Sequence, residues 1–442
     1  MGSRRVRYVG VLTAVAVAVT LSGCSGTGAS GPSLDDAVVP QVSGSSGGSA
    51  PIQNAPCADG TSGMTISLVN NTGRSDSEVY WYLQQQPAGY IYPELVAGPF
   101  TMAAKESISC SALTAGAIYF TLGGSGSVGS PQPHVDDPKK QAQYSAPAIL
   151  WETKRFQTVE LTYPGMANLT AVDMIGAPVD MATSGGDRRV FTCYTDKLQS
   201  ALKKTLDATP GASYSNIVVT NNGQFVRLLS PNINPGTPGY PTFDVYLKSL
   251  AGTTLRIKAT RGVHYAQYTY DYSGTVAADG SIVLTSTAAA APNQTVTIPA
   301  GSLTGNTGAP DTTGIYGNNS PYYLGSDKTT AHHVGENDAY AAVYRDLVAG
   351  FDYGFWRKGG PNDSSAFNTS TSPGPFAGSQ PSNPSFYNAW AAALWPATQA
   401  YGFAFEDTYT LGSRHPLMEL PSGTTLTLTL QPDVTPPGRA CG

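Results

Sequence analysis

The chain has 442 residues, of which 40% are hydrophobic and 10% aromatic, while only 12% are charged. This balance excludes a largely disordered protein, because the apolar content is high enough to build a core. The 25 basic and 30 acidic residues also exclude a nucleic-acid-binding protein, because there is no excess of positive charge to neutralise a phosphate backbone. With 49 Gly and 33 Pro, the chain is expected to be rich in turns and mainly β, in one large domain or two medium ones.

The first 24 residues have the order of an export signal. Arg4, Arg5 and Arg7 precede an apolar run over residues 8–19, and small residues then lead to Cys24. The run is shorter than the roughly 20 apolar residues that span a membrane, and this order is typical of a secretory signal. The Leu-Ser-Gly-Cys ending resembles a bacterial lipobox, in which the Cys is acylated and becomes the new N-terminus. We expect export and attachment to the extracytoplasmic face of a bacterial membrane through Cys24; the alternative is an ordinary signal with a chance Cys.

The segment after Cys24 is expected to be a flexible tether. Residues 25–56 are mostly Gly, Ser, Thr, Ala and Pro, and such a segment cannot bury enough apolar surface to offset its ordering entropy. Cleavage before Cys24 also removes three of the 25 basic residues and no acidic one, so the net charge falls from −5 to −8. The mature chain is therefore mildly acidic.

Four further cysteines follow the tether. An even number in an exported chain, with no Cys-x-x-Cys pair, favours two disulfides over free thiols or a metal site. Cys57 opens the folded region and Cys441 is the penultimate residue, so a bridge between them would close its ends. We expect the pairs Cys57–Cys441 and Cys110–Cys193, among the three pairings that four cysteines allow.

The pattern changes along the folded region. Runs rich in β-branched and aromatic residues, separated by turn residues, predict strands over 64–70, 79–83, 117–122 and 156–163. Further on, leucines at helical spacing predict a helix over 196–207, and the pattern then mixes both types. Strands are expected at 216–220, 224–229, 243–250, 254–259, 281–286, 295–298 and 424–430, and helices at about 336–349 and 385–393. We expect a β-sandwich of residues 57–190 and 395–442 with an inserted mixed α/β domain, residues 191–394.

Signatures of common catalytic centres are weak. The pattern Gly-x-Ser-x-Gly occurs at residues 44–48, inside the tether and not between a strand and a helix as a hydrolase nucleophile requires. His332 and His333 are neighbours, so their side chains point apart, and together with Glu336 they are a weak metal signal. We expect neither a metal nor a cofactor.

Two carboxylates are more informative because acidic residues are scarce. Glu160 lies in a predicted strand, and Asp173 follows 13 residues later in another apolar stretch. If Gly165 turns the chain between them, both acids project from adjacent strands onto one face. Two facing carboxyl groups can cleave a glycosidic bond, since one protonates the leaving oxygen and the other activates water. On spacing alone, two surface or ion-paired acids remain the favoured alternative.

Several blocks resemble one family in its own order. Residues 159–163 and 168–179 are similar to the catalytic segment of glycoside hydrolase family 64, the thaumatin-like β-1,3-glucanases. Residues 225–231, 386–392 and 401–407 are similar to later blocks of that family. The resemblance implies a mainly β fold, a thaumatin-like β-sandwich with an inserted α/β domain, and a wide cleft between them for β-1,3-glucan. We expect a monomer.

The resemblance also implies roles for individual residues. Glu160 matches the general acid and Asp173 the general base of an inverting endo-β-1,3-glucanase, whose carboxyl groups lie about 6.5–9.5 Å apart to admit a water molecule. The residues implied as substrate contacts are Thr162, Thr170, Glu406 and Asp407.

Departures from the family pattern leave an alternative open. Pro164 and Met166 stand where a polar and an aromatic residue are expected, and Phe405-Glu406 replaces Tyr-Asp. A non-catalytic glucan-binding or cell-wall-binding lipoprotein on the same scaffold is the alternative function, and a surface lipoprotein without sugar recognition is the third. Aromatic residues are candidates for sugar-stacking platforms or for core packing: Trp81, Tyr90, Tyr92, Trp356 and Trp390.

Overall fold

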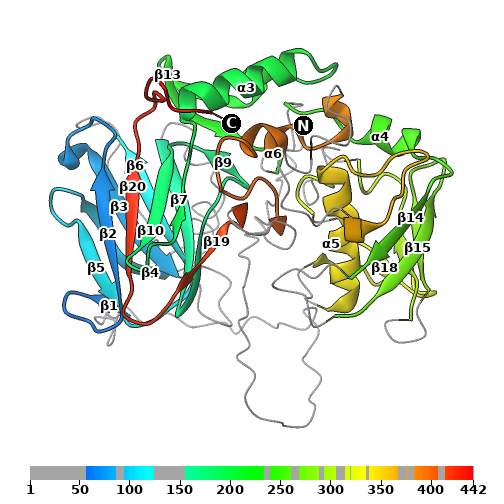
Figure 1. Cartoon of the computed structure of the whole chain (residues 1–442), viewed down its shortest axis with the longest axis horizontal. Helices are drawn as coiled ribbons and strands as arrows, with labels where there is room; N and C mark the ends of the chain where they lie inside the picture. Colours follow the sequence, from blue (N-terminus) through cyan, green and yellow to red (C-terminus); the bar gives the residue numbers. More distant parts are fainter. Residues whose placement is uncertain are drawn as a thin grey trace, which may run out of the picture.

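The structure is a computed structural model of the chain. It describes residues 56–85, 94–123, 155–232, 239–259, 268–287, 293–304, 314–318, 320–334, 338–366, 376, 383–406 and 414–441. Figure 1 shows two lobes side by side, joined at the top of the view by helices and a small sheet. Within the described residues, no helix combines the length and the apolar character needed to cross a membrane.

The first lobe is a sandwich of two six-stranded sheets. One sheet has the order β1-β5-β2-β20-β10-β11, in which β2 and β20 run parallel and the other neighbours antiparallel. Its strands are β1 (Cys57–Ala58), β5 (Ser107–Cys110), β2 (Met64–Asn70), β20 (Thr425–Leu430), β10 (Val179–Thr183) and β11 (Arg188–Arg189). Strand β20 lies between β2 and β10, so this sheet joins strands that are far apart in the sequence.

The second sheet of the sandwich positions the candidate acid. Its order is β19-β8-β7-β6-β3-β4, and all neighbours are antiparallel. The strands are β19 (Leu417–Leu420), β8 (Gly165–Leu169), β7 (Arg155–Tyr163), β6 (Leu113–Leu122), β3 (Val79–Gln85) and β4 (Glu94–Thr101). In β7, Val159, Leu161 and Tyr163 are buried in the core of the sandwich. Because side chains alternate along a strand, Glu160 and Thr162 project from the opposite face.

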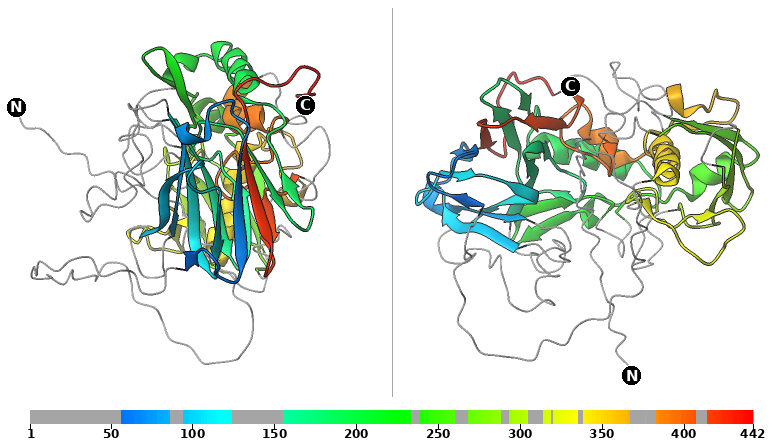
Figure 2. Two further views of the ribbon diagram at one scale, coloured as in Figure 1. Left: turned by 90° about the vertical axis from the view of Figure 1, so that its left-hand side faces the viewer. Right: turned by 90° about the horizontal axis from the view of Figure 1, so that it is seen from below.

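The second lobe is a five-stranded antiparallel sheet packed on a helix. The order is β14-β15-β16-β17-β18. The strands are β14 (Thr254–Lys258), β15 (Asp271–Val276), β16 (Ile282–Ser286), β17 (Val296–Ile298) and β18 (Tyr323–Leu324). Helix α5 (Ala339–Asp352) lies beside this sheet in the right-hand view of Figure 2 and is buried from Ala341 to Asp352. Helix α4 (Asp244–Ser249) belongs to the same part of the molecule.

A small sheet and two helices, here called the middle layer, lie at the top of the view in Figure 1, where the lobes are joined. The sheet has the order β12-β13-β9, with β12 (Val218–Asn221), β13 (Gln224–Leu229) and β9 (Met174–Ile175). The helices are α3 (Thr195–Asp207) and α6 (Ala389–Leu394), and short 3-10 turns are η2 (Asp76–Glu78), η3 (Tyr214–Asn216), η5 (Ser364–Ala366) and η7 (Pro384–Phe386). Strand β9 follows Asp173 directly, so the candidate base lies where the sandwich meets this middle layer.

Most predicted elements are confirmed, and one is wrong. The mainly β fold with an α+β part is confirmed, as are β2, β13 and helix α3 close to their predicted bounds. Residues 243–250 were expected to form a strand, but α4 occupies 244–249. Tyr246, Leu247 and Leu250 are buried there, a spacing that fits one face of a helix as well as an apolar strand. The domain limits at 190 and 395, and a cleft between the lobes, stay predictions.

The expected disulfide pairing is wrong. The structure pairs Cys57 with Cys110 and Cys193 with Cys441. Cys57 and Cys110 lie directly opposite each other on the paired strands β1 and β5. The segment after β20 returns along the start of α3, where Tyr194 N donates to Thr435 Oγ1 at 2.9 Å, and this return brings Cys441 to Cys193. The first pair therefore follows from the pairing of strands and the second from the path of the segment after β20, and cysteine spacing reveals neither.

Candidate active site

Glu160 lies in the middle of strand β7, between Ala117 on β6 and Asn168 on β8. Asn168 Nδ2 donates to Glu160 Oε2 at 3.2 Å, and Asn168 is only 6% exposed. The Glu160 side chain is half-buried, and loss of hydration raises its pKa to about 7, with a smaller upward contribution from the charge of Asp173. The Asn168 hydrogen bond opposes this rise. Glu160 therefore holds a proton at a pH at which an ordinary carboxyl group is ionised.

Asp173 lies in an irregular segment between β8 and β9, not on a strand as expected. Its carboxyl Oδ1 accepts a hydrogen bond from Asn232 Nδ2 at 2.8 Å. Asn232 follows β13, so the middle layer supplies this donor. Burial raises the pKa of Asp173, and the Asn232 bond opposes the rise. Each of the two acids thus receives one carboxamide N–H from a different neighbouring element.

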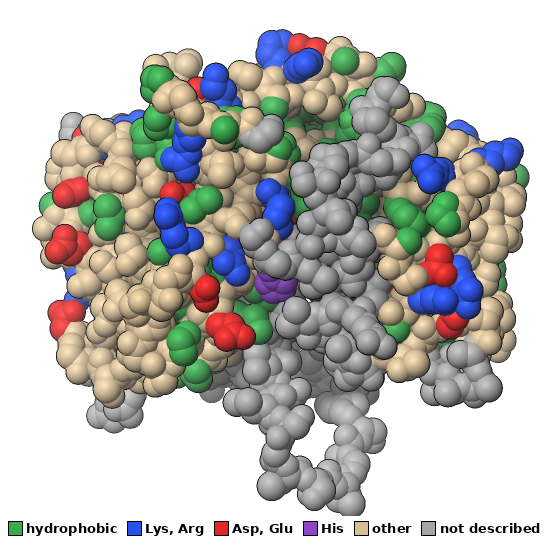
Figure 3. Space-filling view, in the orientation of Figure 1, with side chains coloured by type: hydrophobic (Ala, Val, Ile, Leu, Met, Phe, Trp, Pro, Cys, Tyr) green, Lys and Arg blue, Asp and Glu red, His purple; other side chains and the backbone are tan. Residues whose placement is uncertain are grey.

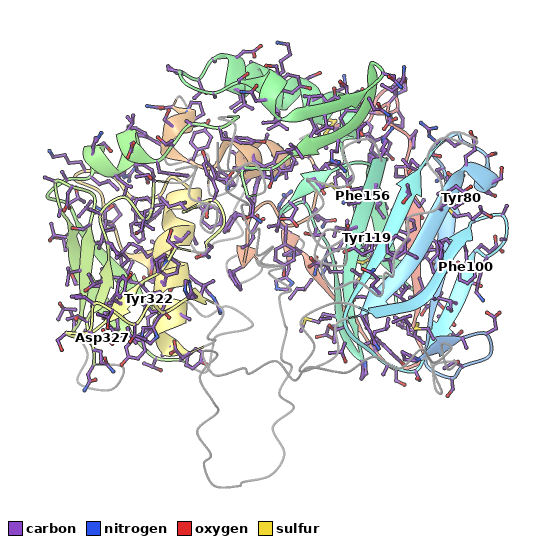
Figure 4. The ribbon with its side chains drawn as sticks, turned by 180° about the vertical axis from the view of Figure 1, so that it is seen from behind. Tyr80, Phe100, Tyr119, Phe156, Tyr322 and Asp327 are labelled. Atoms are coloured by element: carbon purple, nitrogen blue, oxygen red, sulfur yellow. A yellow bond between two sulfur atoms is a disulfide. The ribbon has the colours of Figure 1, made fainter. Side chains whose placement is uncertain are left out.

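Aromatic side chains lie beside the two acids. Tyr119 on β6 stacks on Tyr82 of β3 with ring centroids 4.7 Å apart and planes 5° from parallel. Tyr119, Tyr82, Phe156 and Met174 form one buried cluster, and the Arg227 guanidinium lies over the Phe156 ring, 5.0 Å from its centroid. Figure 4 shows Tyr119 and Phe156 on the part of the sandwich that is nearer the second lobe, and Tyr80 and Phe100 farther from it.

The Tyr119 hydroxyl lies in the electrostatic field of both acids. Burial raises the pKa of Tyr119, and the negative charges of Glu160 and Asp173 raise it further. Tyr119 therefore stays protonated across the working range of an enzyme, so its O–H remains a neutral hydrogen-bonding group beside the two carboxyl groups. Two neighbouring carboxyl groups of this kind suit acid–base chemistry, in which one group gives a proton and the other takes one.

The two implied threonines differ in position. Thr162 projects from the same face of β7 as Glu160 and lies opposite Met166. Thr170 follows β8 and forms an isolated backbone bridge with Tyr401. Contact of either hydroxyl with a sugar stays a prediction.

The acidic block at 406–407 is described only in part. Glu406 is 6% exposed, and its Oε2 accepts a hydrogen bond from Gly402 N. Its carboxyl group therefore stabilises the 401–406 turn, in which Phe405 has a φ of 67°. A role of Glu406 in substrate binding stays a prediction. Asp407 and the lipobox residue Cys24 lie outside the described residues.

The tryptophans expected as candidate platforms belong to the core. Trp81, Trp356 and Trp390 each have 0% exposure, so none of them presents a ring face to a sugar. Tyr90 and Tyr92 lie outside the described residues. Among the described residues, no group of three or more His, Cys, Asp or Glu side chains is arranged to hold a metal ion.

Sequence reasoning missed Asn168, Asn232 and Tyr119. A tight hairpin centred on Pro164 pairs Glu160 with Asn168 and Thr162 with Met166, so the position of Pro164 could have identified Asn168. Tyr119 lies on the face of β6 that carries Ala117, the cross-strand partner of Glu160. Asn232 is 59 residues from Asp173, and no local pattern links the two.

Comparisons with known proteins identify the family of the chain. The family model described as β-1,3-glucanase, glycoside hydrolase family 64, matches residues 99–430. The chain belongs to glycoside hydrolase family 64. As a member of this family, it is a glycoside hydrolase.

Two solved structures share the family 64 fold. One is a laminaripentaose-producing β-1,3-glucanase in complex with laminaritetraose, at 19% identity and a TM-score of 0.53, over 84% of this chain and 99% of that one. The other is a β-1,3-glucanase domain from Clostridium beijerinckii, at 15% identity and a TM-score of 0.54, over 84% of this chain and 98% of that one. Curated proteins yielded no significant match.

Proposed function

We propose that the protein is an endo-β-1,3-glucanase that cleaves with inversion. Glu160 is the general acid that protonates the leaving oxygen, and Asp173 is the general base that activates the attacking water. The observation that carries this proposal is the placement of two partly buried carboxyl groups, each of which accepts a carboxamide hydrogen bond, from Asn168 and Asn232 respectively. Burial also raises the pKa of Glu160 to about 7, as suits a general acid. A protonated acid and an available base are the two groups that inversion needs.

A β-1,3-glucan is the substrate that the observations favour. The solved relative with 19% identity binds laminaritetraose, a fragment of such a glucan. On the face in Figure 3, the described acidic and basic side chains are dispersed, and most of the surface carries neither. Such a surface suits an uncharged polysaccharide, because a charged polymer would require an extended patch of opposite sign.

Release of reducing sugar from laminarin tests the activity. We expect the unmodified protein to release it, and Glu160→Gln and Asp173→Asn each to reduce kcat by at least a hundred-fold. Glu419→Gln is the control, because Glu419 is an exposed acid on β19 of the same sheet. Binding of laminarin without release by the unmodified protein would favour the non-catalytic alternative instead.

The lipid anchor is proposed on the sequence alone. The basic segment, the short apolar run and the Leu-Ser-Gly-Cys ending support acylation of Cys24 and attachment to the extracytoplasmic face of a bacterial membrane. We expect the protein to partition with membranes and to incorporate a fatty-acid probe, and Cys24→Ser to abolish both. Incorporation of the probe by Cys24→Ser would contradict the assignment.

A further inference from the structure

The segment that carries Asp173 belongs to no helix or strand, yet four successive carbonyl groups in it are hydrogen-bonded to other elements. Gln157 Nε2 donates to Thr170 O at 3.1 Å, Trp390 Nε1 to Ala171 O at 2.9 Å, Ser230 Oγ to Val172 O, and Ser230 N to Asp173 O at 2.9 Å. A buried carbonyl group without a partner is costly, so these donors decide which conformation the segment adopts.

The donors come from three elements that meet around the site. Gln157 lies on β7, three residues before Glu160, and its side chain donates to the segment that carries Asp173. The strand of one acid therefore contacts the segment of the other. Ser230 follows β13, and its Oγ also accepts from the backbone N of Asn232, the residue that contacts the Asp173 carboxyl group. The third donor is helix α6, through the indole of Trp390.

Trp390 is itself held firmly. It is 0% exposed and lies edge-on to Tyr240, with ring centroids 6.5 Å apart. Helix α6 is capped by Asn388, whose side chain accepts from Ala391 N and donates to Asp352 Oδ1 at 2.9 Å. Through Asn388, the end of α5 fixes the helix that carries the indole.

We propose that Trp390 is a positioning residue that acts through the Ala171 carbonyl to hold Asp173 at the distance and angle at which it activates water. The proposal rests on the proposed function, since it gives Trp390 a role in the reaction of Asp173. Misplacement of a catalytic group by about 1 Å can reduce a rate by about a hundred-fold. Loss of the single hydrogen bond from the Trp390 indole to the Ala171 carbonyl group can therefore lower kcat. Trp390 acts on Asp173 through the backbone and, because its side chain is fully buried, does not contact the glucan.

A matched pair of variants tests this role. Trp390→Phe removes the N–H and keeps most of the ring. Trp356→Phe is the control, because Trp356 is equally buried and its Nε1 donates at 2.9 Å to a different carbonyl, Leu347 O on α5. Both variants lose one buried indole hydrogen bond, and only Trp390→Phe loses it next to Asp173.

Two readouts separate positioning from general stability. We expect Trp390→Phe to reduce kcat on laminarin at least ten-fold, with KM within about two-fold, because the loss falls on the chemical step. We also expect faster hydrogen–deuterium exchange of the peptide 169–176. Trp356→Phe should keep kcat and leave exchange of this peptide unchanged. Faster exchange with an unchanged kcat, or unchanged exchange, would overturn the proposal.

Two serine variants provide a second test if Trp390→Phe does not fold. Ser230→Ala removes the hydroxyl donor to Val172 O, and Ser320→Ala removes a similarly buried donor to Ser302 O in the second lobe. We expect loss of kcat and faster exchange of residues 169–176 in Ser230→Ala alone. If the unmodified protein did not hydrolyse laminarin, the proposed function would fail, and the catalytic role of Trp390 would fail with it. The exchange data would still report whether these donors hold the segment.

Discussion

The clearest quantitative prediction concerns Glu160→Gln, which should make the protein more stable at alkaline pH while it removes activity. In the folded protein, burial raises the pKa of Glu160 from its ordinary 4.5 to about 7. At a pH above both values, the protein therefore keeps a partly buried charge that the unfolded chain holds in water. Gln has nearly the same shape, stays neutral and can still accept the Asn168 hydrogen bond.

The sign and size follow from proton linkage. The folded protein holds the proton of Glu160 more tightly than the unfolded chain does. The contribution of this proton to the stability of the folded protein is therefore complete below about pH 4.5 and is lost as the pH rises through about 7. At about 1.4 kcal/mol per pH unit, the ionised carboxyl group costs about 3 kcal/mol at pH 8. Glu160→Gln should therefore raise the free energy of unfolding by up to about 3 kcal/mol at pH 8, and change it little at pH 4.

Urea titrations of the two proteins at pH 4 and pH 8 measure this difference. The exposed Glu419→Gln serves as the control, because it removes a carboxyl group from the same sheet without removing a buried charge. Equal effects of Glu160→Gln at the two pH values would refute the reasoning, since burial of Glu160 would then not set its protonation.

Three further predictions concern the surroundings of the acids and one disulfide. In the unmodified protein, kcat/KM on laminarin should fall as the pH rises through about 7, because Glu160 loses its proton. Asn168→Leu should move that fall to a pH about 1 unit higher, because it removes a hydrogen bond to the ionised form of Glu160. Asn232→Leu should move the acidic limb of the profile upward, because the pKa of Asp173 rises without its donor; an unchanged acidic limb would count against Asp173 as the base. Removal of the disulfide of Cys193 should lower the free energy of unfolding by about 2–5 kcal/mol in a urea titration, and an unaltered midpoint would contradict this.

The sequence predicted those strands whose side chains alternate clearly against one core, and it missed β4, β8, β10 and β15. The apolar positions of β7 and β20 have the period of a strand, and both lie within the predicted runs. Helix α4 was missed because its six residues are too few to distinguish helical from strand spacing in an apolar stretch. Pairing of the cysteines could not be predicted, since it depends on which strands become neighbours and on the path of the segment after β20.

The sequence singled out the two candidate acids, whose catalytic roles stay predictions, but not the residues that hydrogen-bond to them. Glu160 and Asp173 were found because charged residues are rare and the surrounding blocks resemble the family. Asn232 and Trp390 come from parts of the chain 59 and more than 200 residues away from Asp173 and Ala171, so only the folded topology brings them there. Trp390 illustrates the limit, because its ring was a candidate for core packing or for a sugar platform, and neither interpretation indicated that its N–H contacts the Ala171 carbonyl group.

The configuration of the first product tests the central claim most directly. Laminarin hydrolysis followed by proton NMR in the first minutes should show the α-anomer of the new reducing end, because inversion of a β-linkage yields it. Glu160→Gln and Asp173→Asn should each abolish the signal, while Glu419→Gln should leave it unchanged. Initial appearance of the β-anomer, or hydrolysis that survives both substitutions, would contradict an inverting reaction by Glu160 and Asp173.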